Sequence, residues 1–329
     1  MDKKKTLLVS GAALSTLPLG LLAYMKFVEK RSFASIMAER SIAKKYAKMP
    51  KTDEEFEFFV KMQEEISDKE LEIPEQLEDE IVTVSYVDSM QVFTLNNKEN
   101  KNQKVIIYFH GGAYISQPVP YHYDLLTYLT KKLDAKIVMP IYPKAPKNNY
   151  QNTYPILLKL YNEILNSVDT PNQITLMGDS SGGTLALGLG HLLAQENIEQ
   201  PKDIIALSPW VDIATQNPEI KNYEVLDPML TVWLSQKEAK LWAIDEKNMQ
   251  DPLVSPLFSN NFDKMAKVTI FVGTKEILYP DNELLHEKLL SLGIDHNFIV
   301  KKNMMHDYAI FPIPEAKKAW SKIIKIISE

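Results

Sequence analysis

Residues 173–196 read QITLMGDSSGGTLALGLGHLLAQE, and this stretch decides the fold class. Its apolar start predicts a buried strand, and its second half, from Ser181, predicts a helix. Between them stands the pattern G-x-S-x-G, formed by Gly178, Ser180 and Gly182. A sharp strand-to-helix turn of this kind strains the backbone and needs small residues two positions before and after the serine. We therefore expect the Ser180 hydroxyl to project beyond the end of the strand, beside the amide of Ser181.

The alternative interpretation of this segment is a glycine-rich loop that binds phosphate at a helix N-terminus. Phosphate loops of the Walker type have a lysine directly after the last glycine, whereas Thr184 follows Gly183 here. The segment is therefore more typical of a turn that presents a nucleophilic serine.

A second pair of glycines lies in residues 110–114 (HGGAY), at the end of the predicted strand 104–109. Glycines at such a place let backbone amides approach a bound molecule closely. One amide aimed at a developing oxyanion is worth about 3 kcal/mol in acyl transfer. Taken alone, two glycines after a strand are typical of any turn. Together with the Ser180 turn, they indicate an oxyanion hole.

Strands and helices alternate through most of the chain, which predicts an α/β fold. Alternation of this kind gives a mostly parallel central sheet with helices on both faces. The strands are near-continuous apolar runs, as expected for a sheet buried on both sides. The predicted strands are 81–87, 91–95, 104–109, 135–141, 173–177, 203–207, 267–272 and 297–301. The predicted helices are 121–133, 154–167, 181–196, 281–292 and one that starts near Pro314.

Two segments depart from the alternation and predict a helical cap. Residues 26–80 are charged, lack glycine and have apolar residues at helical spacing. Residues 212–261 follow the strand 203–207 and are rich in large apolar side chains. We expect both to wall a substrate pocket, although the second segment would also fit an insertion with its own small core. The catalytic domain is expected to span 81–329.

The N-terminus differs from the rest of the chain. Residues 1–25 have a basic start followed by an uncharged run at 6–24 (TLLVSGAALSTLPLGLLAY). A helix of this length spans roughly 28 Å, close to the hydrocarbon thickness of a bilayer. We expect an uncleaved membrane anchor or a signal-like segment, and hence a membrane-associated protein. The alternatives are a buried cap helix and a cytoplasmic protein.

Composition limits the remaining classes. The chain has 329 residues, no cysteine and a formal net charge of -6. The absence of cysteine excludes disulfides, thiolate metal sites and a cysteine nucleophile. There is no dense run of lysine and arginine of the kind that nucleic acid binding requires. Neither HExxH nor GxGxxG occurs, so no metal and no organic cofactor are expected.

The two glycine motifs together resemble those of the hormone-sensitive-lipase-like branch of the α/β hydrolases. The resemblance covers residues from about 35 to the C-terminus and includes four further segments: 208–212 (SPWVD), 227–230 (DPML), 251–257 (DPLVSPL) and 305–308 (MHDY). It implies an α/β-hydrolase fold with a helical cap and a carboxylesterase activity. It also implies that the residues of the oxyanion hole are Gly111, Gly112, Ala113 and Ser181.

Within that hole, the resemblance implies that the amides of Gly112, Ala113 and Ser181 bind the oxyanion and that Gly111 shapes the turn. Ala113 replaces the third glycine of the family's usual HGGG, which keeps the amide and adds a methyl group. His110 is then a structural residue of the loop. A second departure is 142–146 (YPKAP), where relatives usually have Tyr-Arg-Leu-Ala-Pro.

The catalytic base is expected after the last strand, because the triad order in this fold is serine, acid, histidine. Of the six histidines, only His306 lies there. The acid should follow the strand 267–272, and Glu276 stands where the family usually has aspartate. Asp281 is the alternative, but its position favours a helix N-cap.

We therefore expect a serine carboxylesterase with the triad Ser180, Glu276 and His306, acting on short- to medium-chain esters as small-molecule substrates. A lipase for longer chains, an amidase or peptidase, and a non-enzymatic binding protein remain alternatives, because the same residues serve several of these classes. Homo-oligomerisation stays open. The residues expected to bind substrate are Tyr114, Leu226, Met229 and Trp233.

Overall fold

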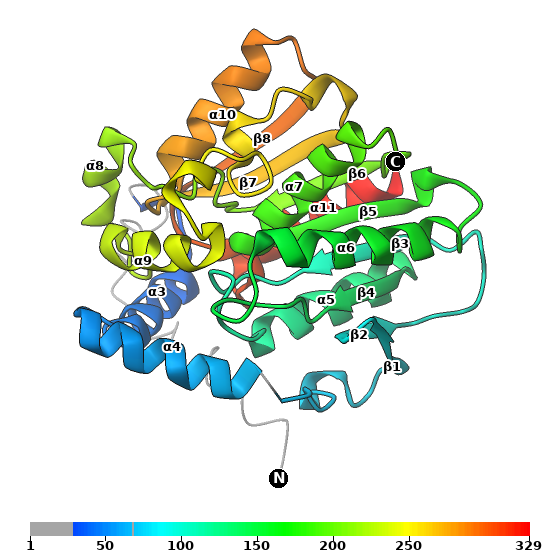
Figure 1. The fold of residues 1–329 in the computed structure, drawn as a ribbon, viewed down its shortest axis with the longest axis horizontal. Helices are drawn as coiled ribbons and strands as arrows, with labels where there is room; N and C mark the ends of the chain where they lie inside the picture. The colour runs from blue at the N-terminus through cyan, green and yellow to red at the C-terminus, as the bar shows by residue number, and fades with distance from the viewer. Residues whose placement is uncertain (1–28, 68) are drawn as a thin grey trace.

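One eight-stranded sheet organises the computed structural model of the protein, which describes residues 29–67 and 69–329. The strand order is β1-β2-β4-β3-β5-β6-β7-β8. The first hairpin is antiparallel, and β2 pairs antiparallel with β4. All pairs from β4 to β8 are parallel. The predicted α/β fold with a mostly parallel sheet is therefore confirmed (Figure 1).

Every predicted strand is present, with ends shifted by a few residues. The strands are β1 (Val82–Val87), β2 (Met90–Leu95), β3 (Val105–Phe109), β4 (Lys136–Pro140), β5 (Ile174–Asp179), β6 (Asp203–Leu207), β7 (Lys267–Lys275) and β8 (His296–Met305). The α-helices are α3 (Phe33–Tyr46), α4 (Asp53–Ser67), α5 (Pro120–Leu133), α6 (Tyr150–Leu165), α7 (Ser181–Gln195), α8 (Lys221–Glu224), α9 (Val232–Ala243), α10 (Tyr279–Ser291) and α11 (Pro314–Ser328).

Two apolar cores lie on the two faces of the sheet. Successive side chains of a strand point to opposite faces, so β3 contributes side chains to both cores. Ile107 and Phe109 pack with α6, α7 and α10 on one face. Ile106 and Tyr108 pack with α5 and α11 on the other. This burial on both faces explains why the central strands are apolar throughout (Figure 1).

Helix α6 begins at Tyr150, four residues earlier than predicted. The side chain of Asn149 caps it by accepting from the amide of Gln151. Pro155 lies inside the helix, five residues after its start, where it has no N–H to donate to the helix.

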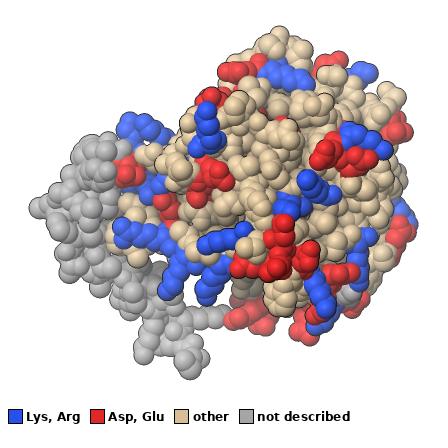
Figure 2. All heavy atoms as spheres, turned by 60° about the vertical axis from the view of Figure 1, so that its left-hand side comes forward, with Lys and Arg blue, Asp and Glu red and all other residues tan. Residues whose placement is uncertain are grey.

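Helices α3, α4, α8 and α9 lie together at one end of the sheet, at the left of Figure 1. The two predicted cap segments meet there, because Phe56 of α4 packs edge-on against Trp233 of α9 with ring centroids 6.4 Å apart. Asp53 also forms an ion pair of 2.5 Å with Lys237. Figure 2 turns this end toward the viewer and shows acidic and basic side chains interspersed over it.

The predicted anchor at residues 6–24 lies outside the described residues. Across the described ranges 29–67 and 69–329, no helix combines the length and the apolar character needed to cross a membrane.

Candidate active site

Ser180 stands on the turn between β5 and α7, as the G-x-S-x-G pattern predicts. Its φ of 51° and ψ of -123° lie outside the regions that side chains prefer. The turn is closed by two glycines. A Cβ on Gly178 would approach the Gly182 carbonyl oxygen to 2.3 Å, and one on Gly182 would approach the Phe109 carbonyl oxygen to 2.0 Å. Only glycine fits at either position, and the serine hydroxyl is thereby held at the carboxyl end of the sheet.

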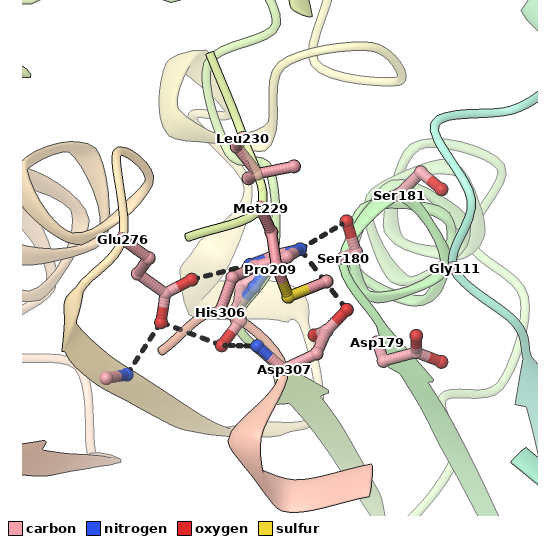
Figure 3. Close-up of polar contacts among 12 residues, drawn as sticks. Gly111, Asp179, Ser180, Ser181, Pro209, Met229, Leu230, Glu276, His306 and Asp307 are labelled. Atoms are coloured by element: carbon pink, nitrogen blue, oxygen red, sulfur yellow. Dashed lines mark hydrogen bonds and ion pairs between the residues drawn. The ribbon is translucent and has the colours of Figure 1, made fainter. Parts of the chain in front are cut away.

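The side chains of Ser180, His306 and Glu276 form one hydrogen-bonded chain (Figure 3). The Nε2 atom of His306 lies 3.0 Å from Oγ of Ser180. The Nδ1 atom lies 2.6 Å from Oε2 of Glu276. They come from the carboxyl ends of β5, β8 and β7, which parallel pairing brings to the same edge of the sheet. This arrangement can transfer a proton from the serine to an oriented imidazole.

Glu276 is fully buried and held by groups other than the histidine. Its Oε1 atom accepts from the amide of Gly273 at 2.6 Å and from the hydroxyl of Ser208 at 2.9 Å. These two donors leave Oε2 for His306, which fixes the direction of the carboxylate. Nothing in the sequence marked Ser208 for this role, although it opens the segment SPWVD at the end of β6.

Asp281, the alternative acid, lies elsewhere. Its Oδ1 atom accepts from the side-chain amide of Asn217 at 2.9 Å. Helix α10 begins at Tyr279, so Asp281 lies within the first turn and the N-cap position belongs to Leu278. The prediction that Asp281 caps the helix is wrong, because the helix begins two residues earlier, at Tyr279, with Pro280 in its first turn.

Asp307 is a residue that the sequence analysis did not single out. Its Oδ2 atom lies 3.2 Å from Nε2 of His306, the nitrogen that also faces Ser180 (Figure 3). Burial raises the pKa of Asp307 well above its usual value. Burial lowers the pKa of His306, but the charge of Asp307 and the bond to Glu276 raise it to about 10. Asp307 and Glu276 thus both contact the ring of His306, and each carboxylate, when ionised, favours the protonated imidazole.

The loop after β3 lies beside Ser180. Gly111, Gly112 and Ala113 line the same cavity as Ser180, and Gly112 and Ala113 have φ values of 122° and 53°. Among the described residues, the amides of Gly112 and Ala113 donate to no backbone or side-chain acceptor. Ser181 opens α7, where the first amides of a helix have no partner within the helix. Free amides beside a nucleophile can bind an oxyanion.

Asp179 ties this loop to the serine turn. Its carboxylate accepts from the hydroxyl of Tyr108 at 2.6 Å and contacts Nε2 of His122 at 3.0 Å. Burial raises its pKa, but His122, Tyr108 and the amide of Gly111 together lower it below the usual value. The carboxylate is thus ionised and anchors the turn of Gly111.

His110 has the surroundings of a structural residue. Its ring stacks on Tyr142 with centroids 4.5 Å apart, and its Nδ1 atom lies 2.7 Å from the Gly111 carbonyl oxygen. Burial lowers its pKa well below the usual value, so it is neutral.

A cavity of about 460 Å³ opens onto Ser180 and His306. This volume is within the range of pockets that bind small molecules. Its walls come from α3, α4, the loop after β3, the segment 229–238 and the loop after β8. Met229 lies in this wall and is nearly buried, so of the four predicted substrate-binding residues it alone lines the cavity in the described part of the chain.

The other three predicted substrate-binding residues lie elsewhere. Tyr114 is fully buried and stacks on Trp242 with ring centroids 4.3 Å apart, so it is part of the core. Trp233 packs against Phe56 at the junction of the cap helices. Leu226 is 45% exposed and is not one of the residues that line the cavity. Large side chains of this kind are found in a core and at a junction between helices as well as in a substrate pocket, so residue type alone could not place them.

Among the described residues, no group of three or more histidine, aspartate or glutamate side chains is arranged to hold a metal ion.

A mostly parallel sheet that brings a serine, a histidine and a glutamate together at the ends of its strands defines the class of α/β hydrolases. A family model described as alpha/beta hydrolase fold matches residues 106–310, and the chain belongs to that family.

Individual relatives are similar over most of their length. An esterase from Acinetobacter venetianus is 29% identical over 222 residues, which are 67% of this chain and 73% of that protein. The solved structure of an inferred esterase from Staphylococcus aureus matches with a TM-score of 0.81 at 29% identity, over 88% of this chain and 99% of that one. An esterase of the bacterial hormone-sensitive lipase family matches in fold with a TM-score of 0.75 at 22% identity, over 90% of this chain and 98% of that one.

Proposed function

We propose that the protein is a serine hydrolase of carboxylic esters. The observation that carries the proposal is the chain of hydrogen bonds from Ser180 through His306 to Glu276 at the mouth of the cavity. Relatives described as esterases support the choice of esters.

In the proposed mechanism, Oγ of Ser180 attacks the acyl carbonyl while Nε2 of His306 takes the hydroxyl proton. Glu276 holds the ring by Nδ1 and stabilises the imidazolium. The amides of Gly112, Ala113 and Ser181 bind the tetrahedral oxyanion. His306 then gives the proton to the leaving alcohol. Water, deprotonated by the same nitrogen, attacks the acyl-enzyme and releases the acid.

We further propose a preference for short- to medium-chain acyl groups. The two cap segments, 26–80 and 212–261, wall the cavity and would limit the chain that can be buried. Each buried CH₂ is worth up to about 0.8 kcal/mol until the pocket ends, after which further carbons add nothing. A panel of p-nitrophenyl esters from acetate to palmitate tests this. We expect kcat/KM to peak between butyrate and octanoate, whereas palmitate turnover equal to butyrate would indicate a lipase.

The same panel separates esters from amides. A p-nitroanilide with the best acyl group should be hydrolysed far more slowly than the matching ester. Comparable rates would instead assign the protein to the amidases or peptidases.

Membrane association through residues 6–24 stays a proposal that rests on the uncharged run alone. The full chain should fractionate with membranes, and a chain that starts at Lys30 should be soluble. If both chains fractionate in the same way, residues 6–24 do not anchor the protein to a membrane.

A further inference from the structure

A buried carboxyl group without a partner lies in the wall of the cavity. Glu238, on α9, is 6% exposed and lines the cavity that opens onto Ser180. Among the described residues, it forms no hydrogen bond and no ion pair. Burial raises its pKa to about 8. Buried carboxyl groups are costly and are nearly always paired, so this one indicates a missing ligand group.

Other polar groups around the same cavity also lack partners. Tyr46, from α3, lines it, and its hydroxyl bonds to no described residue. Burial, followed by the charges of Asp307 and then Glu238, raises the pKa of Tyr46. Gln117, from the loop after Ala113, has both side-chain amide atoms buried without a partner in the described chain. Ser235, one turn before Glu238, is buried in the same wall.

These groups come from three separate elements, α3, α9 and the loop after β3. One stray polar side chain would need no explanation, but unpaired groups that converge from separate elements have the form of a polar binding site. A hydrocarbon chain in this part of the cavity would leave all of them without hydrogen bonds.

The chemistry of the ligand group follows from the charges. The acids lining the cavity are Asp179, Glu238 and Asp307, and the basic groups are His122, His306 and the exposed Lys45. Asp179 is paired with His122, and Asp307 contacts His306, so Glu238 is left to interact with the ligand. A carboxyl group accepts hydrogen bonds whether it is ionised or neutral, so it fits a ligand group that carries a hydrogen-bond donor. In the neutral form it also donates one hydrogen bond, and once ionised it repels an anion.

We propose that Glu238, together with Tyr46 and Gln117, binds a hydrogen-bond donor, either a hydroxyl or an ammonium group, on the ester substrate. This inference rests on the proposed function and adds the substrate class: a polar-substituted ester in place of a plain fatty ester. Glu238 acts as a specificity-determining residue, because the triad and the oxyanion loop are complete without it.

The test compares esters that differ only in the polar group. On the acyl side, p-nitrophenyl 6-hydroxyhexanoate and 6-aminohexanoate are each measured against p-nitrophenyl heptanoate. On the alcohol side, 4-hydroxybutyl butyrate is measured against pentyl butyrate. At least one polar ester should exceed its hydrocarbon match in kcat/KM by about tenfold or more.

Two variants assign that preference to Glu238. Glu238→Leu should abolish it and leave hydrolysis of the hydrocarbon ester intact or faster. Glu238→Gln, which keeps the shape and hydrogen bonding, should retain a preference for hydroxyl but lose a preference for ammonium. Titration of active serine with an organophosphonate corrects each rate for the folded fraction.

The outcomes distinguish this inference from the proposed function. If wild type hydrolyses the hydrocarbon esters as fast as the polar ones in every pair, or if Glu238→Leu keeps the polar preference, the inference is wrong and the esterase function stands. If no ester in the panel is hydrolysed, the proposed function is wrong and the polar subsite with it.

Discussion

Asp307 Oδ2 lies 3.2 Å from Nε2 of His306, on the ring nitrogen that also lies 3.0 Å from Ser180 Oγ. A carboxyl group at this place competes with the serine for the base. Burial lowers the pKa of His306, but the charge of Asp307 in its ionised form and the bond to Glu276 raise it to about 10. Both residues are buried, so solvent weakens this interaction little.

Asp307→Asn should shift the pH dependence of hydrolysis toward lower pH. His306 must be unprotonated to act, so kcat/KM rises with pH through the pKa of His306. Removing the Asp307 charge lowers that pKa, and the acidic limb of the profile should move down by at least one pH unit, by the order of magnitude of such charge pairs. An unmoved limb in the variant would show that Asp307 does not act on the base.

Glu276→Gln should lower kcat by about 10⁴-fold with little change in KM, because an amide can no longer hold His306 in the required tautomer. Asp281→Asn is the matched control, since Asp281 is also buried but bonds to Asn217 and not to His306. The control should keep near-normal kcat. If Asp281→Asn lowered kcat far more than Glu276→Gln does, Asp281 would be the acid of the triad.

Glu238→Gln should stabilise the protein, and more so at high pH. The pKa of Glu238 is about 8 in the folded chain against 4.5 for an unperturbed glutamate, so between these pH values the folded state holds a proton that the unfolded state has lost. The wild-type free energy of unfolding therefore falls as pH rises from about 4.5 through about 8. The stability difference between variant and wild type should be larger at pH 9 than at pH 5, by a few kcal/mol, on the order expected for a shift of this size. Urea unfolding at both pH values measures it, and an equal difference at both would mean that Glu238 is not buried as described.

Gly182→Ala should abolish the folded active site, whereas Gly293→Ala should cost only about 1 kcal/mol. A Cβ on Gly182 would lie 2.0 Å from the Phe109 carbonyl oxygen, so β3 and the serine turn would have to separate. Gly293 has open space around it but a φ of 68°, which strains any other residue mildly. Urea unfolding and organophosphonate titration of both variants test the contrast, and a Gly182→Ala protein with full active-serine content would contradict the packing described for the turn.

Local patterns predicted those features of the fold and site that depend on a few neighbouring residues. The serine turn needs only the glycines around Ser180, and each strand is a short apolar run. The order serine, acid, histidine along the chain then places Glu276 and His306 at the ends of β7 and β8, where the structure has them.

What the sequence could not predict depends on packing between distant segments. Ser208 and Asp307 meet Glu276 and His306 only because β6, β7 and β8 end side by side. Glu238 looks like any surface residue of a helix in the sequence, and only the fold places it, buried, in the wall of the cavity. The reverse holds for Tyr114, which is a predicted substrate-binding residue but whose ring is stacked in the core.

The central claim is that Ser180 is the nucleophile, and covalent labelling tests it most directly. The purified protein is treated with a fluorophosphonate, digested, and the modified residue located by mass spectrometry. We expect one label per chain, on Ser180, with none in Ser180→Ala. Labelling of Ser180 should persist in Ser208→Ala, which removes a hydroxyl that contacts Glu276 and Asp307 but leaves the nucleophile in place. A label on another serine, or undiminished ester hydrolysis in Ser180→Ala, would contradict the account.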